Sequence, residues 1–346
     1  MTKRVLEISV RADLGGGPKH LLDLLTYNKS DIELFSAIPF GYDYSDKIIS
    51  KSKAAINIPH RNFSILSFIK IVLFCKKYKV KTVHSHGRGA GYYSRLLKLF
   101  GFKVIHTLHG VHVEDGIVNK VKVTIDQLLT PFTDLFICVS NGEKKKALDY
   151  QVVNPVRVKV IFNGVLSQEP TQFKSNIPQV AMLGRLSHPK GYDLLISAIE
   201  DFCLKSPEIE FQINIAGDGE EKEKLTTTLS KTKYTKEKIN FIGKTTQPIE
   251  FLKGHTHFLS FSRFEGMPIS VLEAMSIGLP CMVSDVVGNN DIINNDNGYL
   301  FNPESFNKVF KNFILSEHSS TIKTSLNDIK NKFNIETQTK LTLETY

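Results

Sequence analysis

The stretch LSFSRFEGMPISVLEAMSIG, Leu259–Gly278, decides the fold, because an apolar run ends near Glu265 and a helical pattern begins at Pro268. Such a stretch predicts a strand that continues into a helix through a turn. Pro268 suits the first helical position, where its missing N–H costs nothing, and Gly266 lets a ligand approach the backbone closely. The amides of Gly266, Met267 and Ile269 then face outward at a helix N-terminus, which favours phosphate oxygens.

Two carboxylates stand eight positions apart in this stretch, Glu265 in the turn and Glu273 in the helix, so they can contact different parts of one extended ligand. In a plainer interpretation Glu265 is an electrostatic cap and Glu273 is a solvated helix residue. The segment GRLSHPKG, Gly184–Gly191, favours ligand binding, because it follows an apolar run and places Arg185 and Lys190 before a second helix. Two cations and helix N-termini together indicate a diphosphate site.

These motifs resemble glycosyltransferase family 4, a family of retaining GT-B enzymes. The run from Glu265 to Glu273 is similar to the Glu-x7-Glu motif of that family, and Arg185 with Lys190 resembles its diphosphate-binding pair. Further similar segments follow in the family's order, and they cover nearly the whole C-terminal half: Val160–Val165, Ile215–Gly219, Phe241–Gly243 and Asn297–Phe301.

The resemblance implies a GT-B fold, in which two Rossmann-like parallel-sheet domains face a central cleft. It implies that Glu273 binds ribose hydroxyls and that Glu265 binds hydroxyls of the donor sugar. His109 matches a cleft histidine that contacts the donor sugar, so Glu265 and His109 are the candidate catalytic residues. The candidate donor-binding residues are Gly16, Gly17, Arg185, Lys190, Gly217, Gly266, Met267, Pro268 and Glu273.

A length of 346 residues fits two domains of about 150 residues each. Strand and helix patterns alternate in both halves, which predicts parallel sheets covered by helices. We place an N-terminal acceptor-binding domain at 1–166, a polar linker at 167–178 and a nucleotide-sugar-binding domain at 179–324. Residues 325–346 are a candidate C-terminal helix that crosses back to the first domain, as the resemblance implies.

Glycines follow the first predicted strand, at Gly15, Gly16 and Gly17, and predict a loop that phosphates can approach. A plain tight turn is the alternative. The run is not Gly-x-Gly-x-x-Gly, so dinucleotide binding is weakly supported. In the family this loop faces the donor phosphates and the acceptor.

Histidines occur at the carboxyl ends of predicted strands, at His84, His86 and His109, where ligands bind to such sheets. His84 and His86 have no carboxylate cluster beside them in the sequence, which makes a poor zinc site, and we predict no metal. Glu114 and Asp115 are candidates to contact the acceptor hydroxyl, or they belong to an ordinary polar loop.

A formal net charge of +9 indicates an anionic partner. Nucleic acid would explain the charge but not the motifs, so we predict phosphorylated small molecules and no nucleic acid. The N-terminus has a strand pattern, Val5–Val10, instead of a signal peptide, and no window approaches the ~18 apolar residues of a membrane span. These patterns predict a cytoplasmic protein, and four scattered cysteines predict buried, reduced thiols.

The helix predicted within Arg61–Lys81 is strongly apolar and is flanked by lysines. It either covers the sheet with a solvated end, or it rests on an anionic membrane surface, the inner face of the plasma membrane, where each cation contributes ~1 kcal/mol. A second basic group in the same half supports the membrane hypothesis: Lys120, Lys122, Lys144, Lys145 and Lys146.

The resemblance implies a retaining, metal-independent glycosyltransferase of the hexosyltransferase type. It would take a UDP- or GDP-linked sugar, with no further cofactor, and glycosylate a saccharide or polyprenyl-diphosphate-linked acceptor in bacterial surface polysaccharide synthesis, such as O-antigen, lipopolysaccharide or capsule. Cations and helix amides can stabilise the leaving diphosphate without a metal, and no Asp-x-Asp motif occurs. The alternatives are a GT-B-fold sugar-nucleotide epimerase and a non-catalytic sugar-nucleotide-binding partner subunit.

Overall fold

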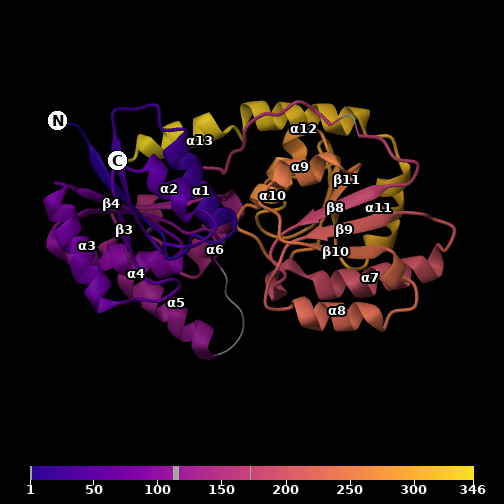
Figure 1. Cartoon of the computed structure of the whole chain (residues 1–346), viewed down its shortest axis with the longest axis horizontal. Helices are drawn as coiled ribbons and strands as arrows, with labels where there is room; N and C mark the ends of the chain where they lie inside the picture. The colour runs from indigo at the N-terminus through magenta and orange to yellow at the C-terminus, as the bar shows by residue number, and fades with distance from the viewer. Residues whose placement is uncertain (1, 112–116, 172) are drawn as a thin grey trace. The chain divides into compact units, whose positions relative to one another are not determined.

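The computed structural model describes residues 2–111, 117–171 and 173–346. Over these residues the chain forms two compact units, Met1–Asn163 with Ile335–Tyr346, and Gly164–Asn334. In each unit parallel strands alternate with helices (Figure 1). The prediction of two Rossmann-like parallel-sheet domains is thereby confirmed.

The described strands of the first unit form a seven-stranded parallel sheet in the order β3-β2-β1-β4-β5-β6-β7. The strands are β1 (Arg4–Ile8), β2 (Glu33–Ile38), β3 (Ala55–Asn57), β4 (Thr82–His86), β5 (Lys103–Thr107), β6 (Leu135–Cys138) and β7 (Val158–Val160). The helices are α1 (Gly16–Thr26), α2 (Ser45–Lys51), α3 (Ile65–Lys77), α4 (Arg88–Leu97), α5 (Ile117–Leu129), α6 (Asn141–Asp149) and α13 (Ile335–Leu343).

Side chains of β1 alternate between two cores, because successive residues of a strand point to opposite faces of the sheet. Leu6 and Ile8 pack with residues of α3 and α4, whereas Val5 packs with residues of α1 and α13. Glu7 has the same parity as Val5. Its carboxylate therefore lies on the face that α1 and α13 cover.

The described strands of the second unit form a six-stranded parallel sheet in the order β10-β9-β8-β11-β12-β13. The strands are β8 (Gln179–Leu183), β9 (Gln212–Ala216), β10 (Ile239–Gly243), β11 (His257–Ser260), β12 (Cys281–Ser284) and β13 (Tyr299–Phe301). The helices are α7 (Tyr192–Lys205), α8 (Lys222–Ser230), α9 (Pro248–Lys253), α10 (Ile269–Ser276), α11 (Phe306–Leu315) and α12 (Ser319–Asn331).

The limits between the units differ from those predicted. Residues before the predicted linker already belong to the second unit, because the Val165 N–H donates to Phe333 O at 2.9 Å. The Thr171 N–H, inside the predicted linker, donates to Ile277 O at 2.8 Å. The stretch predicted as one C-terminal segment contains two helices, of which α12 belongs to the second unit and α13 to the first.

The predicted burial of the cysteines is confirmed. All four cysteines are buried and free, and burial raises the pKa of the Cys75 thiol to about 12. Within the described residues, none of the helices combines the length and the apolarity that crossing a bilayer requires.

Candidate functional site

The candidate residues lie where each sheet reverses its strand order, which is where open α/β sheets bind ligands. In the second unit the reversal falls between β8 and β11, and the loops that follow these strands carry Lys190 and Glu265. In the first unit it falls between β1 and β4. There the loop after β1 leads to Gly16 at the start of α1, and His86 ends β4.

The loops after β8 and β11 meet in an ion pair. The Lys190 Nζ lies 2.5 Å from Glu265 Oε1, and the Ser262 hydroxyl donates to the same carboxylate oxygen at 2.6 Å. The lysine stem passes over Gly184, where a Cβ would lie 3.6 Å from Lys190 Cε. Sequence analysis identified Lys190 and Glu265 for separate tasks and missed both their pairing and Ser262.

The loop after β12 holds the Glu265 loop in place. The Ser284 hydroxyl donates to Ser262 O at 2.5 Å, and Asn289 Nδ2 donates to Ser284 Oγ at 3.2 Å. Gly288 has a φ of +87°, and a Cβ there would lie 2.6 Å from Gly266 O. Only glycine fits both this conformation and this close approach, so Gly288 supports the position of Gly266.

Arg185 pairs with Glu220, whose Oε2 lies 2.9 Å from Arg185 Nε. The two side chains are 35% and 60% exposed. An ion pair this open to water contributes only ~0–1 kcal/mol, so the guanidinium can exchange Glu220 for an anionic ligand at little cost.

The start of α10 differs in detail from the prediction. Pro268 is the N-cap residue, with a φ of −72° and a ψ of 118°, and the helix begins at Ile269. Met267 is 4% exposed and Glu273 is 5% exposed. The interpretation of Glu273 as a solvated helix residue is therefore wrong, because its carboxylate belongs to the interior.

Gly217 has a steric role. A Cβ at this position would lie 1.9 Å from Gly184 O, so glycine lets the loop after β9 pack against the loop after β8. The Leu186 N–H donates to Asp218 O at 3.1 Å and joins the same two loops. Gly217 thus shapes the loop that carries Arg185 and Lys190.

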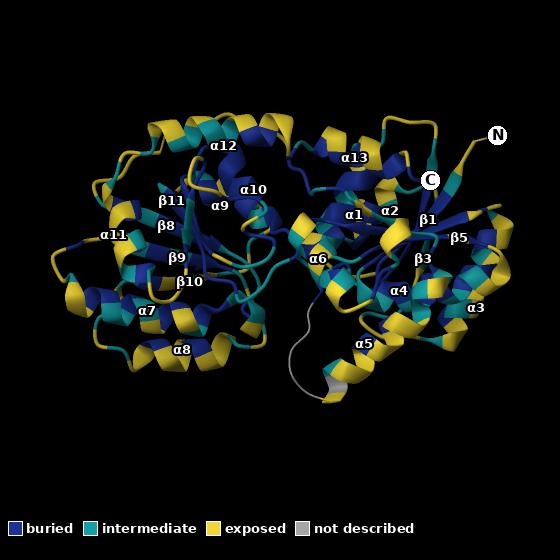
Figure 2. Cartoon of the chain, turned by 180° about the vertical axis from the view of Figure 1, so that it is seen from behind, coloured by how far each residue is buried: buried dark blue, intermediate teal, exposed yellow. Residues whose placement is uncertain are grey.

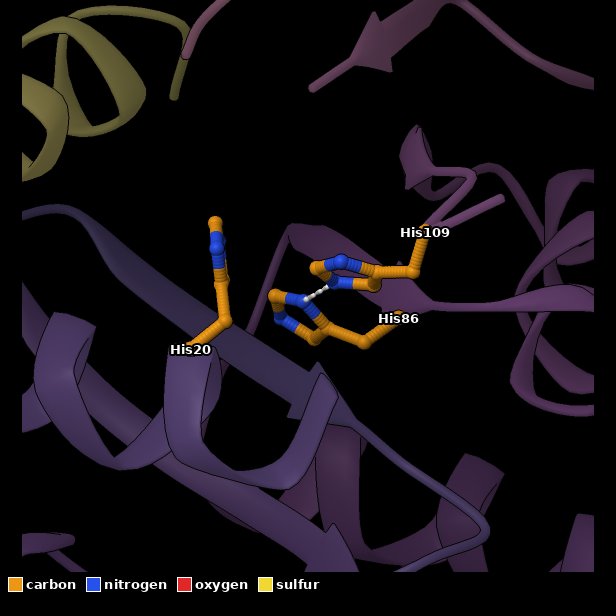
Figure 3. Close-up of side chains that lie close together, drawn as sticks. All are labelled: His20, His86 and His109. Carbon is orange, nitrogen blue, oxygen red and sulfur yellow. Dashed lines mark hydrogen bonds between the residues drawn. The ribbon is translucent and has the colours of Figure 1, made fainter. Parts of the chain in front are cut away.

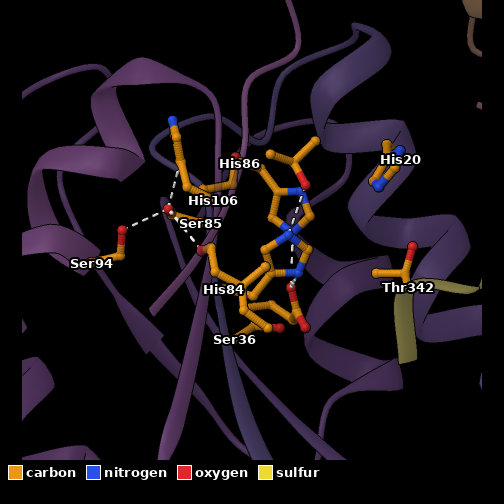
Figure 4. A network of polar contacts seen from close by, with 12 residues as sticks. His20, Ser36, His84, Ser85, His86, Ser94, His106 and Thr342 are labelled. Carbon is orange, nitrogen blue, oxygen red and sulfur yellow. Dashed lines mark hydrogen bonds and ion pairs between the residues drawn. The ribbon is translucent and has the colours of Figure 1, made fainter. Parts of the chain in front are cut away.

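Polar side chains interrupt the central strands of the first unit, where a covered parallel sheet usually has apolar residues. Glu7 on β1 and His84 on β4 are 0% exposed and lie side by side in the sheet register. His86 and His106 are buried as well. Figure 4 shows the polar network around these histidines.

Glu7 is the centre of this network. Its Oε2 lies 2.8 Å from His86 Nε2 and 3.1 Å from His84 Nδ1, and its Oε1 accepts from the Tyr346 hydroxyl at 2.6 Å. Burial by itself raises the pKa of Glu7, but the nearby His84 and His86 and their hydrogen bonds outweigh it and lower the pKa to about 2. Glu7 is therefore an ionised carboxylate inside the unit.

His109 reaches the same network from the loop after β5. Its Nε2 lies 3.2 Å from His86 Nδ1, and its ring centroid lies 4.7 Å from that of His20 (Figure 3). Gly17 faces this ring, because a Cβ there would lie 4.0 Å from His109 Cδ2. The structure thus brings together two predicted site residues, Gly17 and His109, with two that lie deeper in the unit.

Three of these histidines stay neutral near pH 7. Burial, with His86 close by, lowers the pKa of His20 to about 3, and burial with His84 close by lowers the pKa of His86 to about 4. Burial, with His20 and His86 close by, keeps the pKa of His109 well below its ordinary value. Neutral imidazoles both donate and accept hydrogen bonds.

The nitrogen atoms of His20, His86 and His109 also lie within 4.8 Å of one another, as do the ligand atoms of Glu7, His84 and His86. Either set has the chemistry to bind a metal ion. The sequence argument against a metal relied on the absence of a carboxylate beside His84 and His86. Glu7 is such a carboxylate, and only strand pairing brings it close to the two histidines. The absence of a metal stays a prediction.

Sequence analysis missed most of the residues that support the histidines. His20 Nδ1 lies 3.0 Å from Asn163 Oδ1 and 2.9 Å from Gln338 Nε2. Gln338 and Tyr346 come from the C-terminal segment, which was predicted to return to the first domain, but the sequence does not indicate that they contact these histidines and Glu7. The one available signal of a buried polar network was Glu7 itself, an acid within an apolar strand pattern. Glu114 and Asp115 lie outside the described residues.

Two family profiles match consecutive parts of the chain. Residues 19–168 match Glycosyltransferase Family 4, and residues 167–330 match Glycosyl transferases group 1. The boundary between the matches falls close to the boundary between the two units at Asn163 and Gly164.

Named relatives and solved structures are similar to the chain over most of its length. The chain is 26% identical over 321 residues to the O-antigen biosynthesis glycosyltransferase WbnH of Escherichia coli, covering 90% of this chain and 91% of the relative. It is 28% identical over 303 residues to the UDP-Gal:alpha-D-GlcNAc-diphosphoundecaprenol alpha-1,3-galactosyltransferase of Escherichia coli, covering 80% and 78%. The structure of Anabaena Alr3699/HepE in complex with UDP-glucose superposes with a TM-score of 0.84 at 16% identity, covering 99% and 98%.

The chain is a GT-B protein, because it has two Rossmann-like units with polar clusters at their switch points and is similar in fold to the HepE structure. Both consecutive profile matches are to glycosyltransferases. The chain accordingly belongs to the GT-B glycosyltransferases of the family 4 type.

Proposed function

We propose that the protein is a retaining hexosyltransferase that transfers a sugar from a nucleotide-diphosphate sugar to a hydroxyl of a saccharide or polyprenyl-diphosphate-linked acceptor. The observation that carries the proposal is the ion pair of Lys190 and Glu265, 2.5 Å apart at the switch point of the second sheet. A cation for phosphate and a carboxylate for sugar hydroxyls lie side by side there. A UDP-sugar is the first donor to test, because a structure similar to this chain was solved with UDP-glucose.

Each residue has a task that follows from its chemistry. Lys190 and Arg185 bind the diphosphate, and the amides before α10 add donors at a helix N-terminus. Charge grows on the leaving diphosphate in the transition state, so these groups stabilise it most when the glycosidic bond breaks. Glu265 accepts hydrogen bonds from sugar hydroxyls, and the buried Glu273 accepts them from the ribose. No metal is needed for this arrangement.

The acceptor proposal rests on the relatives. One relative is named for O-antigen biosynthesis, and another is named for a diphosphoundecaprenol-linked acceptor. We therefore propose a lipid-linked saccharide acceptor in the synthesis of a bacterial surface polysaccharide, and a cytoplasmic enzyme that works at the inner face of the plasma membrane.

An exposed face of α3 supports the membrane part of this proposal. The helix buries Ile71 and Cys75 in the core, but Leu66 is 72% exposed and Leu73 is 60% exposed. Residues at this helical spacing share one face, and exposed apolar and basic residues alternate along it: Leu66, Ile69, Lys70, Leu73, Lys76 and Lys77. This face favours contact with a membrane over the alternative, in which the helix only covers the sheet.

Other segments of the first unit also expose apolar and basic side chains. Phe100 is 55% exposed, and its ring centroid lies 5.6 Å from that of Phe68 on α3. On α5, which Figure 2 shows as largely exposed, Ile117 and Leu128 are 82% and 68% exposed, and Lys120 and Lys122 are exposed as well. Apolar side chains with lysines between them fit an anionic bilayer surface.

The test of the transferase proposal is a thermal-stability screen against UDP-, GDP- and ADP-sugars, followed by product analysis. A ligand at 100 times its dissociation constant stabilises the protein by ~2.7 kcal/mol. The sugar that stabilises best is then incubated with a polyprenyl-diphosphate-linked saccharide, and the anomeric configuration of the product is read by NMR.

A product that keeps the donor's configuration is expected. An altered sugar nucleotide formed without any acceptor would identify an epimerase instead. Binding of a sugar nucleotide without turnover on any acceptor would favour the non-catalytic partner subunit.

A further inference from the structure

A chain of hydrogen bonds leads from Glu7, in the interior of the first unit, to the ring of His109. The Glu7 carboxylate is fully buried and ionised, and an ionised carboxylate only accepts hydrogen bonds. Since its Oε2 lies 2.8 Å from His86 Nε2, that nitrogen carries the proton of the neutral ring. The other ring nitrogen of His86, Nδ1, is then an acceptor.

The next hydrogen bond of this chain joins His86 to His109. His109 Nε2 lies 3.2 Å from His86 Nδ1, so His109 Nε2 is the donor of this contact. A neutral imidazole carries one N–H. His109 Nδ1 therefore keeps its lone pair, and within the described residues no hydrogen-bond partner contacts it.

The backbone of His109 is held as firmly as its ring. His109 has a φ of +59° and Gly110 a φ of +109°, so a histidine is kept in the left-handed region that side chains usually avoid. The Gly110 N–H donates to the carboxylate of Glu143, whose other oxygen accepts from the Val139 N–H at 2.6 Å. Glu143 is 1% exposed. A strained conformation secured by a buried carboxylate indicates that the position of this ring matters.

We propose that Glu7 and His86 are positioning residues that fix the tautomer of His109. Glu7 places the proton of His86 on Nε2, and His86 in turn places the proton of His109 on Nε2. His109 then presents Nδ1 as an acceptor for a hydroxyl of the donor sugar. The identity of that ligand rests on the proposed function, whereas the tautomer is a property of the protein alone.

The tautomer is measured first, by NMR of the full chain labelled with ¹⁵N in its histidine rings and without any ligand. His109→Gln assigns the His109 signals. We expect His109 to be protonated on Nε2 only, from pH 6 to pH 8. Protonation on Nδ1, or a mixture of both tautomers, overturns the proposal.

Glu7→Gln is the decisive variant, because it keeps the size of the side chain but removes its charge and adds an N–H donor. His109 should then no longer be protonated on Nε2 alone, because a glutamine side chain can either accept from His86 Nε2 or donate to it. With the donor and acceptor found in the screen, kcat should fall roughly tenfold, while KM for the donor changes less than about twofold. A loss of this size is typical when a hydrogen-bonding partner that orients a functional histidine is removed. An unchanged tautomer in this variant overturns the proposal.

Tyr346→Phe is the matched control. It removes the hydrogen bonds of the Tyr346 hydroxyl to Glu7 Oε1 and His84 Nδ1, and it leaves Glu7 Oε2, which faces His86, in place. The wild-type tautomer of His109 should persist. If Glu7→Gln does not fold, His86→Phe removes both nitrogens that contact Glu7 and His109, and both tautomers of His109 should appear in it. If His109 is still protonated on Nε2 alone in His86→Phe, the proposal is contradicted.

A bound metal ion could also fix the His109 nitrogen, and titration with zinc tests for it. Zinc bound at one equivalent, with His109 signals that move on addition of EDTA, would show that the metal fixes the nitrogen, and it would overturn the proposal. UDP affinity of Lys190→Ala tests the donor site in the second unit. A wild-type affinity there, together with the expected tautomer of His109, would reject the diphosphate site assigned to Lys190 in the proposed function and leave the positioning role intact.

Discussion

Lys190 and Glu265 form an ion pair between the loops after β8 and β11, although 75 positions separate them in the sequence. The Nζ–Oε1 distance is 2.5 Å, and the side chains are 26% and 11% exposed. Water screens such a pair only in part. The cation proposed for the diphosphate and the carboxylate proposed for the sugar are therefore coupled, and a change in one alters the other.

This coupling predicts opposite effects of two substitutions on UDP binding. Lys190→Ala removes a charged hydrogen-bond donor, a contact worth ~1.5–3 kcal/mol, so the dissociation constant for UDP should rise roughly tenfold or more. Glu265→Gln removes the charge that competes with phosphate for Lys190. UDP should then bind at least as tightly as to the wild type, while sugar transfer falls. Titration calorimetry measures both affinities.

Lys253→Ala on α9 is the control for loss of a lysine, because Lys253 pairs with Glu250 at 2.8 Å outside the two loops. It should bind UDP like the wild type. Equal affinities for Lys190→Ala and Lys253→Ala would place the diphosphate elsewhere. Weaker UDP binding by Glu265→Gln would show that this carboxylate does not compete with the phosphate.

The architecture could be predicted because buried parallel strands leave a direct pattern in the sequence. The strand and helix patterns that alternate in both halves predicted two helix-covered parallel sheets, and the structure has them. The bounds of short strands could not be predicted, since a strand of three residues, such as β3 or β13, gives too little pattern. The return of α13 to the first unit depends on tertiary contacts, and the sequence pattern alone does not locate it.

The candidate site could be predicted only residue by residue. Local motifs identified Lys190, Glu265 and His109, because each follows a strand pattern. Their partners depend on which strands are neighbours and in which register. Glu7 and His84 lie opposite each other only because β1 pairs with β4 across 77 positions of sequence, a fact that no local pattern carries.

Metal removal should leave sugar transfer intact. Lys190, Arg185 and the amides before α10 supply the positive potential that a bound magnesium ion would give to the leaving diphosphate. The assay is the transfer rate before and after treatment with EDTA. Loss of activity on chelation that Mg²⁺ or Mn²⁺ restores would contradict this prediction.

Asp126→Asn should destabilise the first unit. Asp126 accepts from Arg88 Nε at 2.7 Å and from Arg95 Nη1 at 2.9 Å, and Arg95 is only 1% exposed. The substitution leaves the Arg95 charge buried without a counter-charge, so the free energy of unfolding should fall by ~3–5 kcal/mol in urea titrations. Lys29→Gln, which removes the exposed pair with Glu336, should change it by less than ~1 kcal/mol. Similar values for the two variants would contradict the prediction.

Stability should decrease as the pH falls from 6.5 toward 4. The pKa of His86 is lowered from 6.5 to about 4 by burial, so below pH 6.5 the unfolded chain takes up a proton that the folded chain refuses. The free energy of unfolding then declines by up to ~1.4 kcal/mol per pH unit for one histidine. Burial of His20 adds to the decline, whereas Glu7, with a pKa of about 2, contributes only below its ordinary value of 4.5.

Urea titrations between pH 7.5 and pH 4.5 measure this decline, and His86→Gln should make it shallower by about one proton. Thr226→Gln on α8 is the control, because the exposed Thr226 carries no group that titrates in this range, and it should leave the slope unchanged. Equal slopes for His86→Gln and the wild type would show that His86 does not titrate differently in the two states.

Binding to membranes should depend on the exposed face of α3. Lys76→Glu with Lys77→Glu reverses two charges beside Leu73, so sedimentation with anionic vesicles should decrease while transfer to a soluble acceptor persists. The charge attraction should weaken with salt, because the Debye length shrinks from ~10 Å at 0.1 M to ~3 Å at 1 M. The matched control reverses two exposed lysines of α12, Lys323→Glu with Lys330→Glu, which changes the net charge equally in the second unit. If both double variants lose vesicle binding to the same extent, net charge and not this face attracts the protein to the membrane. If the wild-type protein does not bind anionic vesicles at low salt, the proposal of a lipid-linked acceptor is contradicted.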